Sequence, residues 1–136
     1  MASGIYTQVK ADWWNKNIDM VNDVIKVALL DNSHSFTATD TTWADVSANE
    51  VSGAGYVAGG ATLSGKSVTE GTATKFDASN VTWSSITTTA YHAVLYDTTV
   101  SNNLICSIDL GGAQTVTATD LTIDWNANGI LTLTTG

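Results

Sequence analysis

Three side chains of this sequence have the chemistry of a nucleophile or a general base: His34, His92 and Cys106. Cys106 is the only cysteine, and the apolar run 104–108 around it is typical of a small buried hydrophobe. A thiol nucleophile needs a histidine beside it, and a catalytic set also needs a group that orients the base. The spacing of His34, His92 and Cys106 along the sequence does not indicate such a set. We therefore expect no enzymatic activity, no catalytic residue and no cofactor.

Carboxylates are numerous but do not form a recognisable ligand pattern. Asp40, Asp45 and Glu50 offer the oxygen ligands that Ca²⁺ prefers, yet they lack the spacing and the central glycine of an EF-hand loop. Two histidines without further ligands do not make a tetrahedral zinc site. A glycoside hydrolase needs two carboxyl groups held at a defined distance from each other. The sequence shows no recognisable scaffold that would hold any acidic pair in this way. We expect no metal site.

Aromatic residues are the stronger indication of a binding surface. The chain has five tryptophans, and adjacent rings at Trp13 and Trp14 point to different sides of a helix. One ring can therefore cover the core while the other stays available to a neighbour, although a large ring can also lie flat over its own domain. Because aromatic side chains are favoured interface anchors, we predict that the partner-binding residues are Trp13, Trp14, Trp43 and Tyr56.

These residues need elements that position them, and the N-terminal half predicts a helix, a strand and a loop. Ile5, Val9 and Trp13 recur every four residues, which predicts a short helix over about 5–15 with these three on one face. The apolar run 24–30 predicts a buried strand. Residues 32–60 are rich in Ser, Thr, Asp and Gly and predict a long ordered loop, with a helical turn over 41–46. A loop of that length is typical of a contact surface.

From residue 61 onward, alternating apolar and polar residues predict consecutive antiparallel strands. Asn128-Gly129 can supply the positive φ angles of a tight hairpin, and Trp83 and Trp125 are expected in core strands. Including the strand before the loop, we expect seven or eight strands in one domain over 1–136: a mainly β, antiparallel β-sandwich, with the jelly roll as one form of it, preceded by the short helix. The later strands are expected at 61–68, 72–76, 80–84, 90–96, 104–109, 121–125 and 130–134.

Composition limits the partners. Thirteen acids against five lysines and no arginine give a net charge of −8, and without arginine the chain lacks the side chain best suited to grip phosphate or guanine. No apolar run approaches the roughly 20 residues of a membrane span, and no secretory leader is recognisable. We expect no nucleic-acid or membrane partner and synthesis in a cytoplasm. Proline often keeps an exposed edge strand from pairing with another chain, and this sequence has none. We therefore expect assembly with neighbouring copies to cover the strand edges.

Four segments carry a resemblance when taken in order: 25–29 (IKVAL), 45–56 (DVSANEVSGAGY), 76–83 (FDASNVTW) and 123–131 (IDWNANGIL). With these segments the chain resembles, over about 5–134, a little-characterised family of small tailed-bacteriophage virion structural proteins. The resemblance implies a non-enzymatic virion component, assembled in the bacterial host cytoplasm, and carries over no catalytic residue.

We therefore expect a capsid decoration, or cement, protein that stabilises the phage head as a homo-oligomer. Its expected partners are copies of itself, with trimers suggested by the local threefold axes of icosahedral shells, and the major capsid protein or another virion protein. A head-to-tail connector or tail component is the alternative within the virion. A carbohydrate-binding β-sandwich module is the alternative from a different class, because exposed tryptophans on a sandwich also suit sugars.

Overall fold

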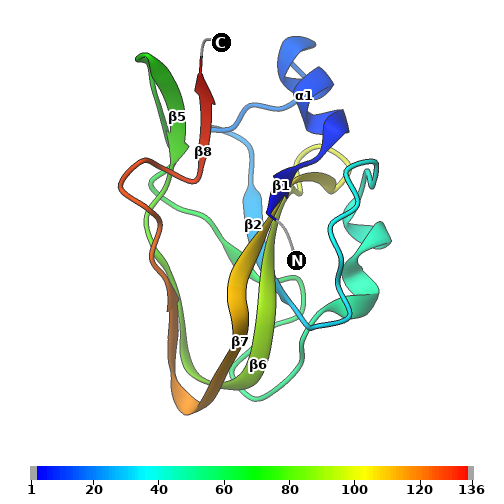
Figure 1. Cartoon of the computed structure of the whole chain (residues 1–136), viewed down its shortest axis with the longest axis vertical. Coiled ribbons are helices and arrows are strands. Elements are labelled where there is room, and N and C mark those ends of the chain that lie inside the picture. Colours follow the sequence, from blue (N-terminus) through cyan, green and yellow to red (C-terminus); the bar gives the residue numbers. More distant parts are fainter. Residues whose placement is uncertain (1–2, 135–136) are drawn as a thin grey trace.

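The computed structural model describes residues 3–134, which form two antiparallel sheets, one short α-helix and two 3-10 turns (Figure 1). This confirms a mainly β chain with antiparallel sheets and a short N-terminal helix. The elements in chain order are β1 (Gly4–Ile5), α1 (Thr7–Trp14), β2 (Ile25–Leu30), the 3-10 turns Trp43–Asp45 and Ser47–Asn49, β3 (Ala61–Thr62), β4 (Ser67–Thr69), β5 (Ala73–Asp77), β6 (Val81–Asp97), β7 (Asn103–Ile123) and β8 (Leu131–Thr134).

The larger sheet has the strand order β1-β7-β6-β2-β3, and the smaller sheet has the order β4-β5-β8. Every strand pair in both sheets is antiparallel. Two separate sheets are compatible with a sandwich, whereas the jelly-roll arrangement stays a prediction.

A long hairpin of β6 and β7 dominates the larger sheet and differs from the expected short strands. The segments 80–84 and 90–96 belong to one strand, as do 104–109 and most of 121–125. Gly111 and Gly112, which fall between the expected strands 104–109 and 121–125, form a positive-φ kink inside β7. Strand β6 carries register shifts on either side of Ile86. Because bulges bend a strand without ending it, the two strands bend together and return toward β5 and β8 (Figure 1).

The hairpin has two halves with different surroundings. We call residues 92–97 and 103–109 its near half, and residues 81–91 and 110–123 its far half. In the near half, β2 pairs with β6, while β1 and the backbone of Tyr6 and Thr41 hydrogen-bond to β7. In the far half, the loop before β3 contacts β6, and among the described residues no third strand pairs with β7. The near half is therefore the centre of the fold.

The N-terminal helix is shorter than expected. Residue Ile5, predicted on its apolar face, belongs to β1 and pairs with Cys106. Val9 is fully buried, as the helical spacing predicts, and Asp12 is also buried because its carboxylate accepts hydrogen bonds from the side-chain amides of Asn17 (3.3 Å) and Asn103 (3.2 Å). The helix is thus fixed to the start of β7 by a polar contact as well as by packing.

Residues 31–60 form the predicted long loop without a regular strand, and its helical turn is a 3-10 turn over Trp43–Asp45. Two of its glycines are required by close approach to neighbouring strands. A Cβ on Gly53, whose φ is +146°, would lie 1.9 Å from the carbonyl oxygen of Thr87, and a Cβ on Gly60 would lie 1.9 Å from that of Val27. The loop therefore runs closely along the edge of the larger sheet.

The smaller sheet corrects the expected hairpin at Asn128-Gly129. The tetrapeptide 126–129 does turn, with Gly129 at φ +91° and its N–H bonded to the carbonyl of Asn126 (2.8 Å). The strand that follows, β8, pairs with β5 instead of returning along β7. The turn therefore connects the two sheets, and Trp125 lies just beyond β7 with its indole N–H bonded to the carbonyl of Ser79 (3.0 Å).

Candidate functional site

An apolar groove lies between α1 and the smaller sheet, with a volume of about 210 Å³. We call it the aromatic groove. Figure 1 shows the elements that supply most of its lining, α1 and the β5–β8 pair, at the same end of the molecule. Its lining residues are Trp13, Trp14, Met20, Val68, Thr74, Lys75, Phe76, Leu131 and Leu133.

The helix positions two neighbouring indoles differently, as the sequence predicts. Burial of Val9 directs one face of α1 to the core, and Trp13 packs at the margin of that core with its indole nitrogen buried. Trp14 is one step further round the helix and is 91% exposed. An indole exposed to this degree leaves nearly all of its apolar surface in water, which is unfavourable unless another surface covers it.

The smaller sheet supplies the opposite wall through strand alternation. Val68 pairs with Phe76, and Phe76 with Leu131, so these three side chains share one face of the sheet. Thr74 and its partner Leu133 lie two positions further along on the same face. Phe76 is buried, whereas Val68 and Leu133 are 50% and 55% exposed. The apolar face of this sheet thus begins at the core and continues outward into solvent beside Trp14.

Trp43 and Tyr56, the other two predicted partner-binding residues, lie away from this groove. Trp43 stacks on Tyr96 with ring centroids 4.7 Å apart and an interplanar angle of 9°. The Tyr56 hydroxyl donates to the Glu50 carboxylate (2.7 Å) and accepts from the Leu29 N–H (3.1 Å), and its burial raises the pKa of the phenol. Both rings are partly buried and hold the long loop against the larger sheet.

Apart from Trp13 and Trp14, the groove residues were not identified from the sequence as site residues, and the half-exposed Val68 and Leu133 are among those missed. The alternation at 131–134 does indicate that Leu131 and Leu133 share a face. It does not indicate that this face extends beyond the core, because that depends on how far the smaller sheet projects past its neighbours.

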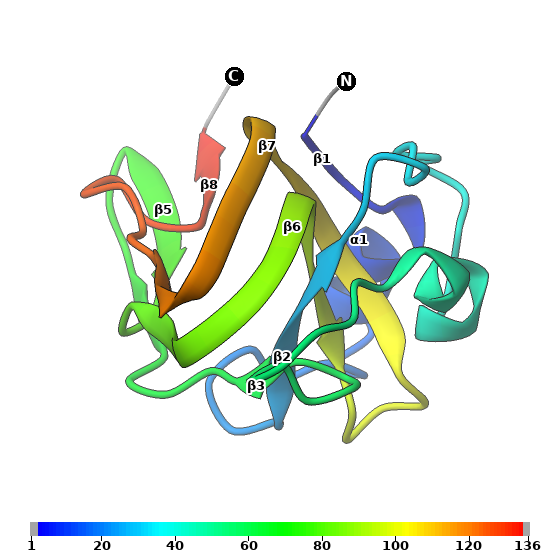
Figure 2. The same ribbon diagram turned by 90° about the horizontal axis from the view of Figure 1, so that it is seen from below.

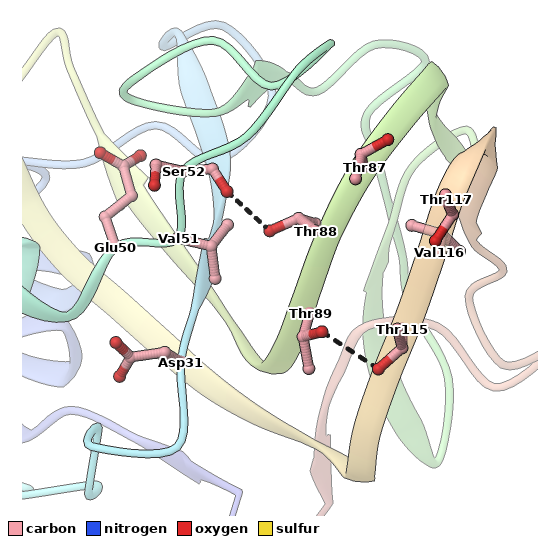
Figure 3. A pocket seen from close by; sticks show the side chains of 10 residues that line it. All are labelled: Asp31, Glu50, Val51, Ser52, Thr87, Thr88, Thr89, Thr115, Val116 and Thr117. Atoms are coloured by element: carbon pink, nitrogen blue, oxygen red, sulfur yellow. Dashed lines mark hydrogen bonds between the residues drawn. The ribbon is translucent and has the colours of Figure 1, made fainter.

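A second hollow, of about 360 Å³, is polar and lies where the long loop meets the far half of the hairpin (Figure 3). Hydroxyl groups dominate it. Thr88 donates a hydrogen bond to the Ser52 carbonyl (3.0 Å), and Thr89 and Thr115 are bonded across the strands (3.1 Å). Its full lining is Asp31, Glu50, Val51, Ser52, Thr87, Thr88, Thr89, Thr115, Val116 and Thr117. These hydroxyl contacts attach the loop and join the two strands.

Of the three carboxylates considered as cation ligands, those of Asp45 and Glu50 make hydrogen bonds within the chain. Asp45 accepts from the N–H groups of Thr41 and Thr42 as the cap of its 3-10 turn, and this lowers its pKa. Besides the Tyr56 hydroxyl, Glu50 accepts from the N–H of Gly59 (2.7 Å). Within residues 3–134 no group of three or more His, Cys, Asp or Glu side chains is arranged to hold a metal ion.

The two histidines do meet, which their positions in the sequence did not indicate. The rings of His34 and His92 lie 4.9 Å apart edge to face, and the His34 Nε2 is 3.0 Å from the Ser107 hydroxyl. Both rings are almost fully buried, and burial lowers the pKa of each imidazole. Cys106 precedes Ser107 in β7 and belongs to the core on the opposite face, where burial raises the pKa of its thiol to about 12. The strand thus separates the thiol from the histidine pair.

Comparison of the chain with protein-family models, with curated proteins and with solved structures gives no significant match. A search of the described residues for a helix long and apolar enough to cross a membrane finds none.

Proposed function

We propose that this chain is a non-enzymatic structural subunit of a tailed-bacteriophage particle, in which it decorates the capsid and stabilises the head. The observation that carries the proposal is the aromatic groove, where a 91% exposed Trp14 stands beside the half-exposed Val68 and Leu133. The resemblance of four ordered segments to virion structural proteins gives the biological setting.

The energetics favour an assembly role for this surface. A buried indole removes on the order of 150–250 Å² from water, which is several kcal/mol before costs at about 25 cal/mol per Å². Association costs a large part of that gain in lost freedom of the subunit. One such contact therefore gives weak binding, whereas many copies attached to one shell act together through multivalency. A decoration protein works under that condition.

The polar chemistry of the chain is used internally, which also supports a structural role. The histidine pair is buried together with Ser107, and the Asp45 and Glu50 carboxylates hold turns of the long loop. The Cys106 thiol has a pKa of about 12 and is protonated at neutral pH. These groups stabilise the loop and core that support the outer surface.

The proposal is tested in the assembled particle. Purified virions should contain the protein in many identical copies, and a phage that carries Trp14→Ser should retain fewer copies per particle and release its genome at a lower temperature. The matched control is Val57→Ser, because Val57 is 72% exposed but lies outside the groove. Copy number is measured by quantitative mass spectrometry and genome release by dye fluorescence on heating. Absence of the protein from purified virions would reject the function.

A connector or tail component is the second candidate within the same proposal, because a groove of this kind also suits contacts in a neck or tail. A particle reconstruction that places the chain in the neck or tail would reject decoration and leave the structural role. Specific binding of the isolated domain to a glycan array, abolished by Trp14→Ser, would instead favour the carbohydrate-binding alternative.

A further inference from the structure

We infer that the aromatic groove is occupied by a second copy of this chain, in a symmetric contact that places Trp14 of each copy in the groove of the other. The inference rests on the proposed function, since it names the neighbour that a virion subunit would meet at this surface.

The first argument is the distribution of charge. The segments 7–24 and 64–79, which carry most of the groove, hold four of the five lysines and five of the thirteen acids. The third groove segment, 126–134, has no charged residue. Nearly all of the net charge of −8 therefore belongs to the rest of the chain. Two copies repel each other through the acidic parts of the chain, and the groove is a region through which they can meet with little repulsion.

The second argument is the arrangement of projection and hollow. Trp14 both lines the groove and projects from its rim, being 91% exposed. In a twofold contact both copies use the same surface patch. If the projecting Trp14 of one copy enters the groove of the other, the second Trp14 therefore enters the groove of the first. An indole entering the groove would pack on Val68 and Leu133, the two half-exposed side chains of the opposite wall.

The third argument concerns size. A standard stable interface buries about 800 Å² on each partner, and a groove with one indole and a few aliphatic side chains provides only part of that area. The contact between two copies is therefore weak in solution and depends on concentration. Salt should strengthen it by screening the repulsion between two acidic molecules, whereas binding of a basic partner at the same groove would weaken with salt.

Sedimentation velocity of the purified full chain over a wide concentration range tests the inference. We expect the average mass to rise from monomer toward dimer with concentration, and to rise further with added salt. Trp14→Ser should weaken self-association at least tenfold. Val68→Ser should weaken it severalfold, while the same substitution at Val57, outside the groove, should leave it unchanged. Circular dichroism checks that each variant remains folded.

The outcomes separate the inference from the proposed function. The second copy is ruled out as the occupant if the chain stays monomeric at all concentrations. It is also ruled out if Val57→Ser weakens association as much as Val68→Ser does. In either case, virions that still contain the protein would leave the proposed function intact. If the chain forms trimers, and Trp14→Ser weakens their formation, the twofold geometry is ruled out. Groove-dependent dimers of a protein absent from virions would support the contact and reject the function.

Discussion

The near and far halves of the β6–β7 hairpin consist of the same two strands and have opposite roles. In the near half, residues 92–97 and 103–107 are all buried, with one core on each face of the sheet. In the far half, buried and exposed positions mostly alternate along β6, and β7 is exposed or half-buried throughout. Figure 2 shows β1, β2 and the loop on one side of the hairpin, and the far half extending toward the side where β5 and β8 lie.

The comparison shows that strand pairing alone does not decide where stability resides. Backbone hydrogen bonds join β6 and β7 in both halves. The near half also has neighbouring backbone on both strand edges, whereas in the far half only the loop contacts β6 and side chains make further bonds at the bulges. There the N–H of Ser85 donates to the Asp120 carboxylate (2.9 Å) and that of Ala118 to the Thr87 hydroxyl (2.9 Å). The near half is therefore buried on both faces, whereas the far half places only alternate side chains of β6 in the core.

The largest expected effect is in the near half. Leu95→Ala removes a fully buried side chain and should lower the free energy of unfolding by about 2–5 kcal/mol. Thr117→Ala, on the exposed side of the far half, should change it by less than about 0.5 kcal/mol. Urea denaturation followed by tryptophan fluorescence measures both. Equal losses for the two variants would contradict the division.

The second prediction concerns the attachment of the long loop to the far half. Gly53→Ala adds a Cβ where the Thr87 carbonyl lies 1.9 Å away, so the loop must move and the bond from the Thr87 N–H to the Ala54 carbonyl is lost. We expect destabilisation of about 2–3 kcal/mol. Gly71→Ala is the control, because its nearest neighbour atom would be 3.5 Å away and its φ is not positive. Similar melting temperatures for the two variants would show that the loop is free to shift.

The third prediction concerns a buried acid at the end of the near half. Asp97 is fully buried with one oxygen accepting from the N–H groups of Thr99 and Val100, and burial followed by the nearby Asp23 raises its pKa to about 6. Because the folded state holds the proton more tightly than the unfolded state, this group favours folding below about pH 4, and that contribution is lost as pH rises through about 6. The charged form is then a cost at neutral pH.

Asp97→Asn keeps the accepting oxygen and removes the charge. It should stabilise the protein at pH 7.5 by about 1–3 kcal/mol relative to the parent chain, with the difference shrinking toward pH 4. Thermal unfolding at several pH values checks this. A difference between the two proteins that is constant with pH would assign the effect to packing instead of ionisation.

The smallest expected effect is at a strained position of the far half. Ala118 has φ +51°, a conformation that costs an L-residue roughly 1 kcal/mol or more. Ala118→Gly relieves this cost but adds freedom to the unfolded chain, so we expect a net stabilisation of up to about 1 kcal/mol. Ala113→Gly, at an exposed position of β7 without positive φ, should instead destabilise by about 0.5–1 kcal/mol. The same sign for both variants in chemical denaturation would contradict the assignment of strain.

The sequence predicted what depends on local pattern. The continuous apolar run at 24–30, the alternation after residue 61 and the helical spacing of Val9 and Trp13 each led to the right kind of element. The merging of short strands into β6 and β7 was missed, because Gly111-Gly112 is equally compatible with a turn and a bulge. Local pattern also does not specify that β8 pairs with β5, since that choice depends on packing between distant segments.

The candidate site was predicted in part for the same reason. Adjacent indoles at Trp13 and Trp14 must point in different directions on any helix, so one exposed ring followed from the sequence. To predict the opposite wall of the groove, one would have to know that the smaller sheet lies beside α1. No local sequence pattern indicates this. Trp43 and Tyr56 were proposed because they lie in a loop, and loops of this length can also be fixed by their own aromatic side chains, as these are.

The pairing of β1 with β7 has a consequence for how the chain folds during synthesis. Gly4 pairs with Ser107, so β1 leaves the ribosome about a hundred residues before its partner strand does. Nonlocal pairings of this kind slow folding, while the β6–β7 hairpin can form from adjacent segments. We expect the hairpin to form first and the N-terminal strand and helix to dock onto it late, in a chain that contains no proline to add an isomerisation delay.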